Sequence, residues 1–536
     1  MSKVAEYLQQ HVVGEVLTTQ DAREYFSKDS SIFKITPQII VYPRTENDVR
    51  KIARFSWQLA ERGRLVPITA RGLGTDQGGA AIGPGILVVF PAHMNKILSL
   101  DSNKGFVSAQ PGTNFGRIQQ TLLTHGQFLP PYPASMEYST IGGAVANNAA
   151  GEKTVKYGTM KDFTRQLRVV LANGEVIVTK RLSKKELVHK KGLPTFEGEI
   201  YRSIDNILSD NIDIIENSQP AVSKNTAGYD IWSVKGNDGS FDLTPLFAGS
   251  QGTLGIISEI ICDTETYNPN KSLIVAKIDT LEHLGVAVSK IRDLNPSALE
   301  LVDYHLLDFT NKTNPNYLKD TIQPPFPHFV LFIEFDDISG RKQKNRVKKS
   351  KKILESLKSQ IVISKDNHEQ EDYWKIRHSA SAVIWQHPGN KRALPVIEDG
   401  IVPLENLTEF INKVYELFKV FNLEIAIWGH VGNANLQIQP YFDLSSLGDR
   451  QQMFKLMDAY YDLVFSFGGS TSGEHNDGRI RAPYLVKMYG QEIYEIFRKI
   501  KQQLDPYGTL NPGVKIDVTV NDNQKILRVF EYYRRR

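Results

Sequence analysis

The 536-residue chain is 41% hydrophobic and 23% charged, an ordinary globular composition that excludes disordered and fibrous proteins. Its length exceeds what one hydrophobic core usually supports, so we expect two or more domains. The 64 basic and 60 acidic residues leave a net charge of +4, which is too balanced to indicate nucleic-acid binding.

The single cysteine, Cys262, excludes an intrachain disulfide, a CxxC zinc site and an iron–sulfur cluster, and it fits a reducing compartment. No run approaches the roughly 20 apolar residues that a membrane span needs. The polar N-terminus lacks the apolar core of a signal peptide. We therefore expect a soluble, cytoplasmic protein, with peripheral contact at the inner face of the membrane as the alternative.

The first third of the chain alternates short apolar runs with an amphipathic stripe. Residues 39–42 predict a strand, Thr45 begins a predicted helix with a variant of the capping box, and Gly63 ends it. Residues 65–68 predict the next strand. Together these elements predict one βαβ unit.

A glycine-rich loop at 71–79 follows, and residues 86–90 then resemble a strand. A Rossmann fingerprint requires GxGxxG at the start of a helix, so a nicotinamide site of that kind is disfavoured. The glycines let backbone N–H groups approach a pyrophosphate, and Arg71 adds positive charge. The alternative is a plain glycine-rich turn.

Two further segments are candidates for ligand contact. Small residues and two adjacent amides run through 130–151, which suits a flat ligand lying against bare backbone. The loop at 249–257 feeds a buried strand and can offer backbone groups to a heterocycle. The alternatives are a tightly packed helix–loop junction and an ordinary turn.

From about residue 269 longer amphipathic segments predict a second, α+β domain, with strands at 329–335 and 425–428. The basic stretch 341–352 either binds anionic lipid or an acidic partner, or forms the solvated face of a helix, which we favour. The basic tail 532–536 is equally ambiguous.

These motifs resemble the FAD-binding domain of the vanillyl-alcohol oxidase (PCMH-type) flavoproteins. The matching segments are 41–49, 71–79, 130–143, 157–174 and 249–257. The resemblance implies two α+β subdomains around FAD. The FAD is expected to be non-covalent, because the 71–79 loop has neither His nor Cys. The residues expected at FAD are Arg71, Gly72, Leu73, Gly74, Thr75, Asp76, Pro133, Ala134, Ser135, Thr140, Gly142, Gly143, Asn147, Ala149, Gly151, Gly158, Gly252, Gly255, Ile256, Ile257 and Asn511.

The C-terminal half resembles the D-lactate/glycolate/D-2-hydroxyglutarate dehydrogenase branch. The matching segments are 374–377, 399–403, 429–432, 473–475 and 510–513. The resemblance implies an α+β fold in four parts: a helical extension (1–35), a PCMH-type FAD-binding domain (36–268), an FAD-linked oxidase substrate domain (269–504) and a segment that returns to the FAD domain (505–536). The implied reaction is hydride transfer from a small 2-hydroxy acid to FAD.

By the same resemblance, three residues are expected at the substrate. Oxidation of an alcohol requires removal of the hydroxyl proton, and His475 is the expected base. Arg377 is expected to bind the substrate carboxylate through its planar guanidinium, with Lys391 assisting. The alternative for Arg377 is an ordinary ion pair.

The resemblance also implies a divalent metal, Zn or Mn, at His430, Gln437 and Glu474. Here the chain departs from the family pattern His-x-Gly-Asp-Gly-Asn-Leu-His, with Asn433, Ala434 and Gln437 at altered positions. A glutamine carbonyl is a poor substitute for imidazole on zinc. Without a metal, His430 and Glu474 are expected to form a hydrogen-bonded pair near the flavin.

The sequence also allows other functions for the protein. The altered segment fits an FAD-dependent oxidase or dehydrogenase of a sugar or another alcohol. A non-redox FAD-containing transferase and a flavin-binding subunit with a degenerate site are the others. The expected electron acceptor is a quinone, a cytochrome or a separate iron–sulfur subunit. The oligomeric state is left open.

Overall fold

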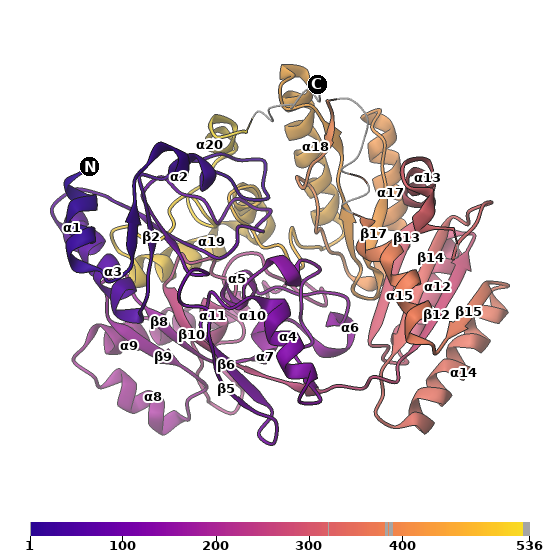
Figure 1. Ribbon diagram of the computed structural model, residues 1–536, viewed down its shortest axis with the longest axis horizontal. Coiled ribbons are helices and arrows are strands. Elements are labelled where there is room, and N and C mark those ends of the chain that lie inside the picture. The colour runs from indigo at the N-terminus through magenta and orange to yellow at the C-terminus, as the bar shows by residue number, and fades with distance from the viewer. Residues whose placement is uncertain (1, 320, 381–383, 385–389, 529–536) are drawn as a thin grey trace.

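The computed structural model describes residues 2–319, 321–380, 384 and 390–528, and it has two lobes (Figure 1). The first lobe contains residues 2–268 and the described segment from about residue 480 to residue 528. The second lobe contains most of the residues between them. The basic tail 532–536 lies outside the described residues.

A four-stranded sheet in the first lobe confirms most of the predicted βαβ unit. Its order is β1 (Glu15–Leu17), β2 (Ile39–Tyr42), β4 (Ile86–Val89), β3 (Ile68–Arg71). Helix α3 (Glu46–Glu61) begins where predicted, and the Thr45 hydroxyl accepts a hydrogen bond from the Asp48 backbone. Strands β2 and β3 are not neighbours, since β4 lies between them and is parallel to both.

Strand β3 begins at Ile68, three residues later than residues 65–68 predict. Pro67 has no N–H group to donate to a neighbouring strand, and Leu65 is exposed. The apolar run therefore marks the approach to the strand and not its start.

A five-stranded antiparallel sheet forms the centre of the first lobe. Its order is β5 (Ile97–Asp101), β6 (Phe106–Ala109), β10 (Ile256–Asp263), β8 (Thr164–Val170), β9 (Val176–Thr179). Helix α19 (Leu485–Leu504) packs into the same hydrophobic core (Figure 1). The chain therefore returns to the first lobe before residue 505, while the domain limits at 35, 268 and 504 stay predictions.

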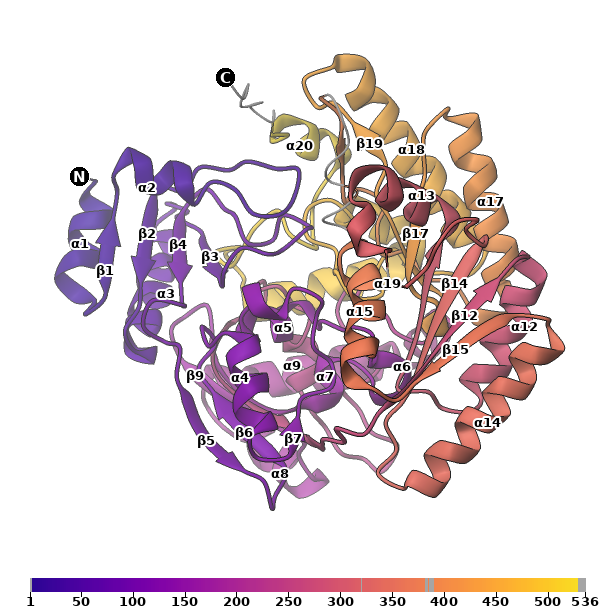
Figure 2. The same cartoon turned by 45° about the vertical axis from the view of Figure 1, so that its right-hand side comes forward.

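A six-stranded sheet forms the second lobe. Its order is β15 (Gln360–Ser364), β12 (Ser272–Ile278), β14 (Phe329–Phe335), β13 (Ala298–Asp303), β17 (Ile427–His430), β18 (Asn435–Ile438). The outer face packs against α12 (Leu281–Arg292), α14 (Gly340–Ser356), α17 (Leu407–Val420) and α18 (Leu447–Ser466). The inner face carries α13 (Tyr304–Thr313) and α15 (Asn367–His378). Figure 2 shows α12 and α14 on one side of the sheet and α15 on the other.

The inner face of this sheet carries the polar side chains that matter for function. Alternate residues of a strand face opposite sides of a sheet. Leu299 and Leu301 pack in the outer core, whereas Ala298 and Val302 pack in the inner one, so Glu300 between them faces inward. The same alternation turns a second set of polar or aromatic residues inward: Glu334, Trp428, His430 and Gln437.

The remaining helices and short strands complete the two lobes. In the first lobe they are α1 (Lys3–His11), α2 (Gln20–Tyr25), α4 (Phe115–Leu123), β7 (Gln127–Phe128), α5 (Ile141–Asn147), α6 (Thr154–Tyr157), α7 (Met160–Phe163), α8 (Lys184–Lys191), α9 (Phe196–Asp210), α10 (Ile212–Glu216), α11 (Thr244–Phe247), β11 (Glu265–Thr266) and α20 (Val520–Lys525). In the second lobe they are β16 (Arg392–Ala393) and β19 (Tyr441–Phe442).

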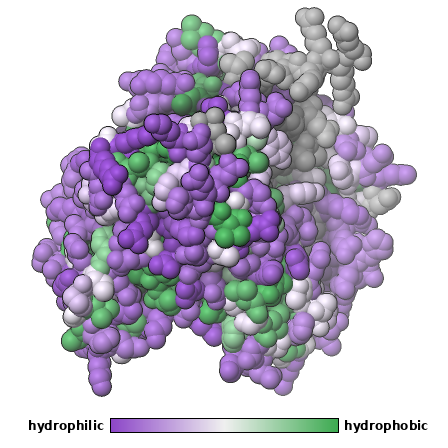
Figure 3. Space-filling model, turned by 60° about the vertical axis from the view of Figure 1, so that its left-hand side comes forward, coloured by the Kyte–Doolittle hydropathy of each residue, from purple (hydrophilic) through white to green (hydrophobic). Residues whose placement is uncertain are grey.

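The surface is largely hydrophilic on the face drawn in Figure 3, where the apolar side chains gather in separate patches. Within the described ranges, no helix is both long and apolar enough to cross a membrane. The basic stretch 341–352 lies on α14, whose buried positions are Gln343, Ser350 and Leu354. Most of its lysines and arginines are therefore exposed, as a solvated helix face requires.

Candidate active site

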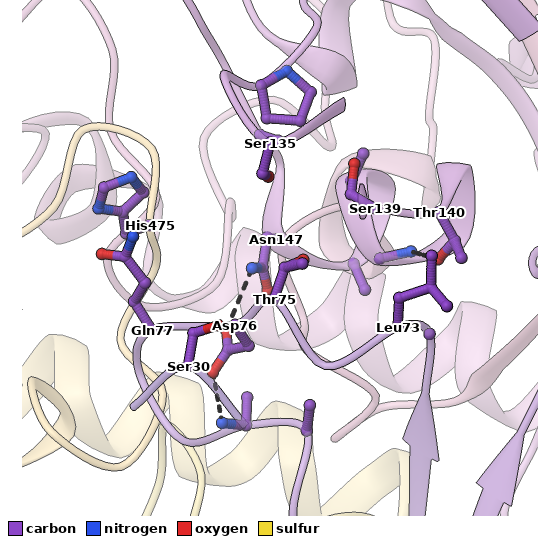
Figure 4. A pocket seen from close by; sticks show the side chains of 18 of the residues that line it. Ser30, Leu73, Thr75, Asp76, Gln77, Ser135, Ser139, Thr140, Asn147 and His475 are labelled. Carbon is purple, nitrogen blue, oxygen red and sulfur yellow. Dashed lines mark hydrogen bonds between the residues drawn. The ribbon is translucent and has the colours of Figure 1, made fainter. Parts of the chain in front are cut away.

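A cavity of about 580 Å³ lies between the two lobes, and it brings together most of the predicted site residues. The predicted residues that line it are Arg71, Gly72, Leu73, Gly74, Thr75, Asp76, Pro133, Ala134, Ser135, Thr140, Gly142, Gly143, Asn147, Ala149, Gly252, Gly255, Ile257, Arg377, His430, Gln437, Glu474 and His475. Figure 4 shows His475 and Thr140 on opposite sides of this pocket.

Bare backbone forms one wall of the cavity. A Cβ atom added to Gly142 would lie 2.6 Å from the Pro111 side chain, and one added to Gly72 would lie 2.4 Å from the Thr140 hydroxyl. Gly74 has a φ of +80°, which L side chains rarely adopt. Larger residues would therefore displace the loops that a flat ligand approaches.

Hydrogen bonds between polar side chains fix the positions of these loops relative to one another. Asp76 accepts hydrogen bonds from the Ala80 backbone (2.7 Å) and from the Asn147 side chain (3.1 Å), as Figure 4 shows. Gln251 donates to the Asn147 side-chain oxygen at 3.1 Å. Three loops that are far apart in the sequence thus meet at one buried carboxylate.

Five predicted site residues do not line the cavity: Gly151, Gly158, Ile256, Asn511 and Lys391. Asn511 instead supports the wall, because its amide donates to the backbone carbonyls of Ala80 and Gln251. Lys391 is half exposed and lies 3.9 Å from Asp449. Its predicted role at the substrate stays a prediction.

Sequence reasoning missed several residues of the second lobe that line the cavity, above all His378, Glu398 and Trp428. His378 lies one residue beyond Arg377 on α15, and its Nε2 atom lies 2.6 Å from a Glu152 oxygen. Glu398 directly precedes the predicted segment 399–403, so extending that segment by one residue would have found it. Trp428 adjoins the predicted segment 429–432 in the same way.

A row of buried, hydrogen-bonded side chains with alternating charge lies on the second-lobe side of the cavity. Arg377 Nε donates to Glu300 (2.8 Å), and Glu300 accepts from His430 Nδ1 (2.8 Å). His430 Nε2 lies 2.9 Å from Glu474 Oε1, and Lys224 Nζ donates to Glu474 Oε2 at 3.1 Å. No pattern in the sequence indicated Glu300 or Lys224 as residues of this site.

Among these charged side chains, the attraction between neighbours outweighs the cost of burying each charge. Burial opposes ionisation of Glu474, but the charges of His430 and Lys224 hold its pKa well below the usual range. Burial likewise disfavours a charged His430, yet Glu300 and Glu474 raise its pKa. Glu300 has a lowered pKa, because His430 and Arg377 outweigh its burial.

His475 lies between two carboxylates. Its Nδ1 atom is 3.7 Å from Glu398 Oε1, and its Nε2 atom is 3.7 Å from Glu474 Oε1. Its backbone N–H donates to Asp399 at 2.7 Å, which anchors the loop. Nδ1 is buried without a hydrogen-bond partner in the described part of the chain. The imidazole is thus oriented, with both carboxylates beyond direct hydrogen-bond distance.

The residues at the implied metal position hydrogen-bond to one another and to Lys224. Gln437 turns its amide nitrogen toward Glu474 Oε1 (2.8 Å), and Lys224 occupies the other oxygen of that carboxylate. Within residues 2–319, 321–380, 384 and 390–528 there is no group of three His, Cys, Asp or Glu side chains that could hold a metal ion. The expectation of Zn or Mn therefore finds no support.

Two family models match the chain: an "FAD binding domain" over residues 37–180 and "FAD linked oxidases, C-terminal domain" over residues 268–514. The chain is an FAD-linked flavoprotein, with an FAD-binding domain and an FAD-linked oxidase C-terminal domain. Its cofactor is FAD, and the glycine-lined wall of the cavity belongs to the matched FAD-binding part.

Curated relatives of the flavoprotein are hydroxy-acid enzymes. It is 27% identical to D-2-hydroxyglutarate dehydrogenase of Escherichia coli (strain K12) over 95% of the chain and 51% of that protein. It is 25% identical to the glycolate oxidase subunit GlcD of Bacillus subtilis (strain 168), covering 90% and 89%. It is 26% identical to D-lactate dehydrogenase of Anaerostipes hadrus, covering 93% and 94%. The chain spans about half the length of the D-2-hydroxyglutarate dehydrogenases that it matches.

Solved structures share the fold of the flavoprotein. A p-cresol methylhydroxylase with substrate bound matches with a TM-score of 0.68 at 14% identity, covering 94% of each chain. An alkyldihydroxyacetonephosphate synthase matches with a TM-score of 0.64 at 17% identity, covering 96% of this chain and 86% of the other. The predicted α+β fold, with its FAD-binding and FAD-linked oxidase parts, is confirmed.

Proposed function

We propose that this flavoprotein oxidises a small 2-hydroxy acid of the D-lactate, glycolate or D-2-hydroxyglutarate type. The observation that carries the proposal is that Arg377 and His475 open onto the same cavity as the glycine loops of the FAD-binding part. A carboxylate-binding cation and a proton acceptor are the two groups that this reaction needs from the protein. The names of the curated relatives support the same substrate class.

In this proposal Arg377 binds the substrate carboxylate. Its Nε atom donates to Glu300, a hydrogen bond that does not use the two terminal nitrogens, and Arg377 lines the cavity. A guanidinium fixed in this way orients a carboxylate through two parallel hydrogen bonds.

His475 takes the hydroxyl proton at a ring nitrogen. The neighbouring carboxylates of Glu398 and Glu474 stabilise the imidazolium that forms. When bound, FAD supplies the chemistry of hydride acceptance from the carbon that carries the hydroxyl. The side chains of this chain bind, orient and deprotonate the substrate.

The remaining partners belong to the same proposal. The reduced flavoprotein passes its electrons to a quinone, a cytochrome or a separate iron–sulfur subunit. FAD is bound non-covalently. A reducing, cytoplasmic location belongs to the same proposal, in keeping with Cys262 as the single cysteine of the sequence.

The test is an anaerobic absorbance titration of the FAD-loaded protein. D-lactate, glycolate and D-2-hydroxyglutarate are added in turn, with the matching 2-deoxy acids and a sugar as controls. Bleaching of the oxidised flavin band by a hydroxy acid, and by none of the controls, supports the proposal. A flavin that a sugar bleaches and no hydroxy acid bleaches rejects it.

A further inference from the structure

The Glu474 carboxylate at the cavity is surrounded by hydrogen-bonding groups. Three groups reach its two oxygens: His430 Nε2 at 2.9 Å and Gln437 Nε2 at 2.8 Å from Oε1, and Lys224 Nζ at 3.1 Å from Oε2. The Lys224 side chain is 0% exposed and the Glu474 side chain 6%. A buried ammonium is retained only where a carboxylate compensates for its lost hydration.

The hydrogen bonds of these atoms differ from the bonding in a metal site. Two ligands of one metal ion both point lone pairs at the ion, so they do not hydrogen-bond to each other. Here His430 Nε2 and Glu474 Oε1 are 2.9 Å apart, a hydrogen-bond distance. The third ligand position holds a neutral amide, Gln437.

Charge gives an independent argument. A divalent cation between His430 and Glu474 would lie next to the ammonium of Lys224, which bonds the same carboxylate. Two positive charges bound to the same buried carboxylate repel each other strongly. Lys224 comes from the first lobe, 250 residues before Glu474, so it is brought there by the docking of the two lobes.

We infer that Lys224 supplies to Glu474 the positive charge that a divalent metal would otherwise bring, so that the cavity works without a metal. The inference rests on the proposed function only in calling the cavity catalytic. Lys224 is a positioning residue: it holds Glu474 in place, and Glu474 faces both His430 and His475.

The first measurement is the metal content of the FAD-loaded protein, which needs no turnover. The protein is dialysed against Zn²⁺ or Mn²⁺ and then against metal-free buffer, and its metal is counted by mass spectrometry. We expect substoichiometric metal. Stoichiometric Zn²⁺ or Mn²⁺ that is retained by the wild type and lost in His430→Ala would overturn the inference.

The second measurement asks whether Lys224 excludes the metal. The double variant Lys224→Met/Gln437→His restores a His–His–Glu set without the ammonium, and we expect it to retain stoichiometric Zn²⁺. The matched control is Lys161→Met/Gln437→His, because Lys161 also pairs with a carboxylate of the first lobe, Asp230 at 2.6 Å, away from the cavity. This control keeps Lys224 and should retain far less Zn²⁺.

Equal zinc in the two double variants would contradict a role for Lys224. Retained FAD absorbance and the thermal midpoint show that each variant is folded, and Lys224→Arg/Gln437→His, which keeps the charge, should behave as the control does. Failure of substrates to bleach the flavin would reject the proposed function without changing these metal counts, so the two failures are distinguishable.

Discussion

Arg377 is fixed to Glu300 by a hydrogen bond from Nε to Oε2 of 2.8 Å, and the Glu300 side chain is 1% exposed. The two residues lie 77 positions apart, on α15 and β13. Because Glu300 also accepts a hydrogen bond from His430, the proposed carboxylate-binding group Arg377 and the polar side chains beside His475 are held by the same carboxylate.

Replacement of Arg377 by lysine should raise the KM for the hydroxy acid by about 10- to 100-fold, with a smaller effect on kcat, because a single ammonium replaces a two-point contact to the carboxylate. Steady-state kinetics with an artificial electron acceptor measures the change. Lys375→Met is the control, since Lys375 is an exposed residue of the same helix that pairs with Asp372. An unchanged KM in Arg377→Lys would show that the substrate carboxylate does not bind to Arg377.

Replacement of His475 by alanine should slow flavin reduction by about 10²- to 10⁴-fold, the usual contribution of a general base. Stopped-flow bleaching of the bound flavin under anaerobic conditions gives the rate. FAD content should stay at the wild-type level, because the glycine loops are untouched. His125→Ala, which removes an exposed imidazole on the first lobe, should leave the rate unchanged. Flavin reduction at the full rate in His475→Ala would show that His475 is not the base.

Replacement of Gly142 by alanine should lower FAD occupancy, because the new Cβ lies 2.7 Å from the Pro111 carbonyl and the loop must shift. The ratio of flavin to protein absorbance after gel filtration measures occupancy. Gly340→Ala is the control, since its Cβ would meet no atom within 4 Å. Full occupancy of Gly142→Ala with an unchanged dissociation constant for FAD would show that this part of the wall does not contact the cofactor.

Glu334 should make the stability of the protein depend on pH. Burial opposes its ionisation, but Lys153 and Lys271 lower its pKa from 4.5 to about 2. A lowered folded-state pKa contributes stability above the unfolded value, which is lost as the pH falls from about 5 toward 2. The contribution is about 3 kcal/mol by this linkage.

Lys153 comes from the first lobe and Glu334 from the second, so this pair joins the lobes. The variant Glu334→Gln should destabilise the protein near neutral pH by about 3–5 kcal/mol, because the buried ammonium of Lys153 then keeps only a longer contact to Glu152, at 4.0 Å. It should also flatten the acid limb of the stability curve. Urea unfolding from pH 7 to the lowest pH at which the protein stays soluble measures both effects. Glu24→Gln, at an exposed ion pair, should leave the curve nearly unchanged.

Several features were predictable because local sequence encodes local backbone geometry. The glycines of 71–79 and the small residues of 130–151 specify where backbone can approach a ligand, and both segments line the cavity. Thr45 predicted the start of α3 through its capping hydrogen bond. The family resemblance placed Arg377, His430, Glu474 and His475 at one site, and all four line the cavity.

What the sequence by itself determined is therefore the flavin fold, the glycine-lined wall and the residue types of the opposite wall. The tertiary structure decided how those residues are partnered. Lys224 meets Glu474 across 250 positions, and Glu300 meets His430 across 130. Such pairs leave no periodic or local signal, since they form only when the two lobes dock or when strands far apart in the chain become neighbours in one sheet. The physical reason is that a buried charge is compensated by whichever opposite charge the packing brings near, and packing is a property of the folded chain.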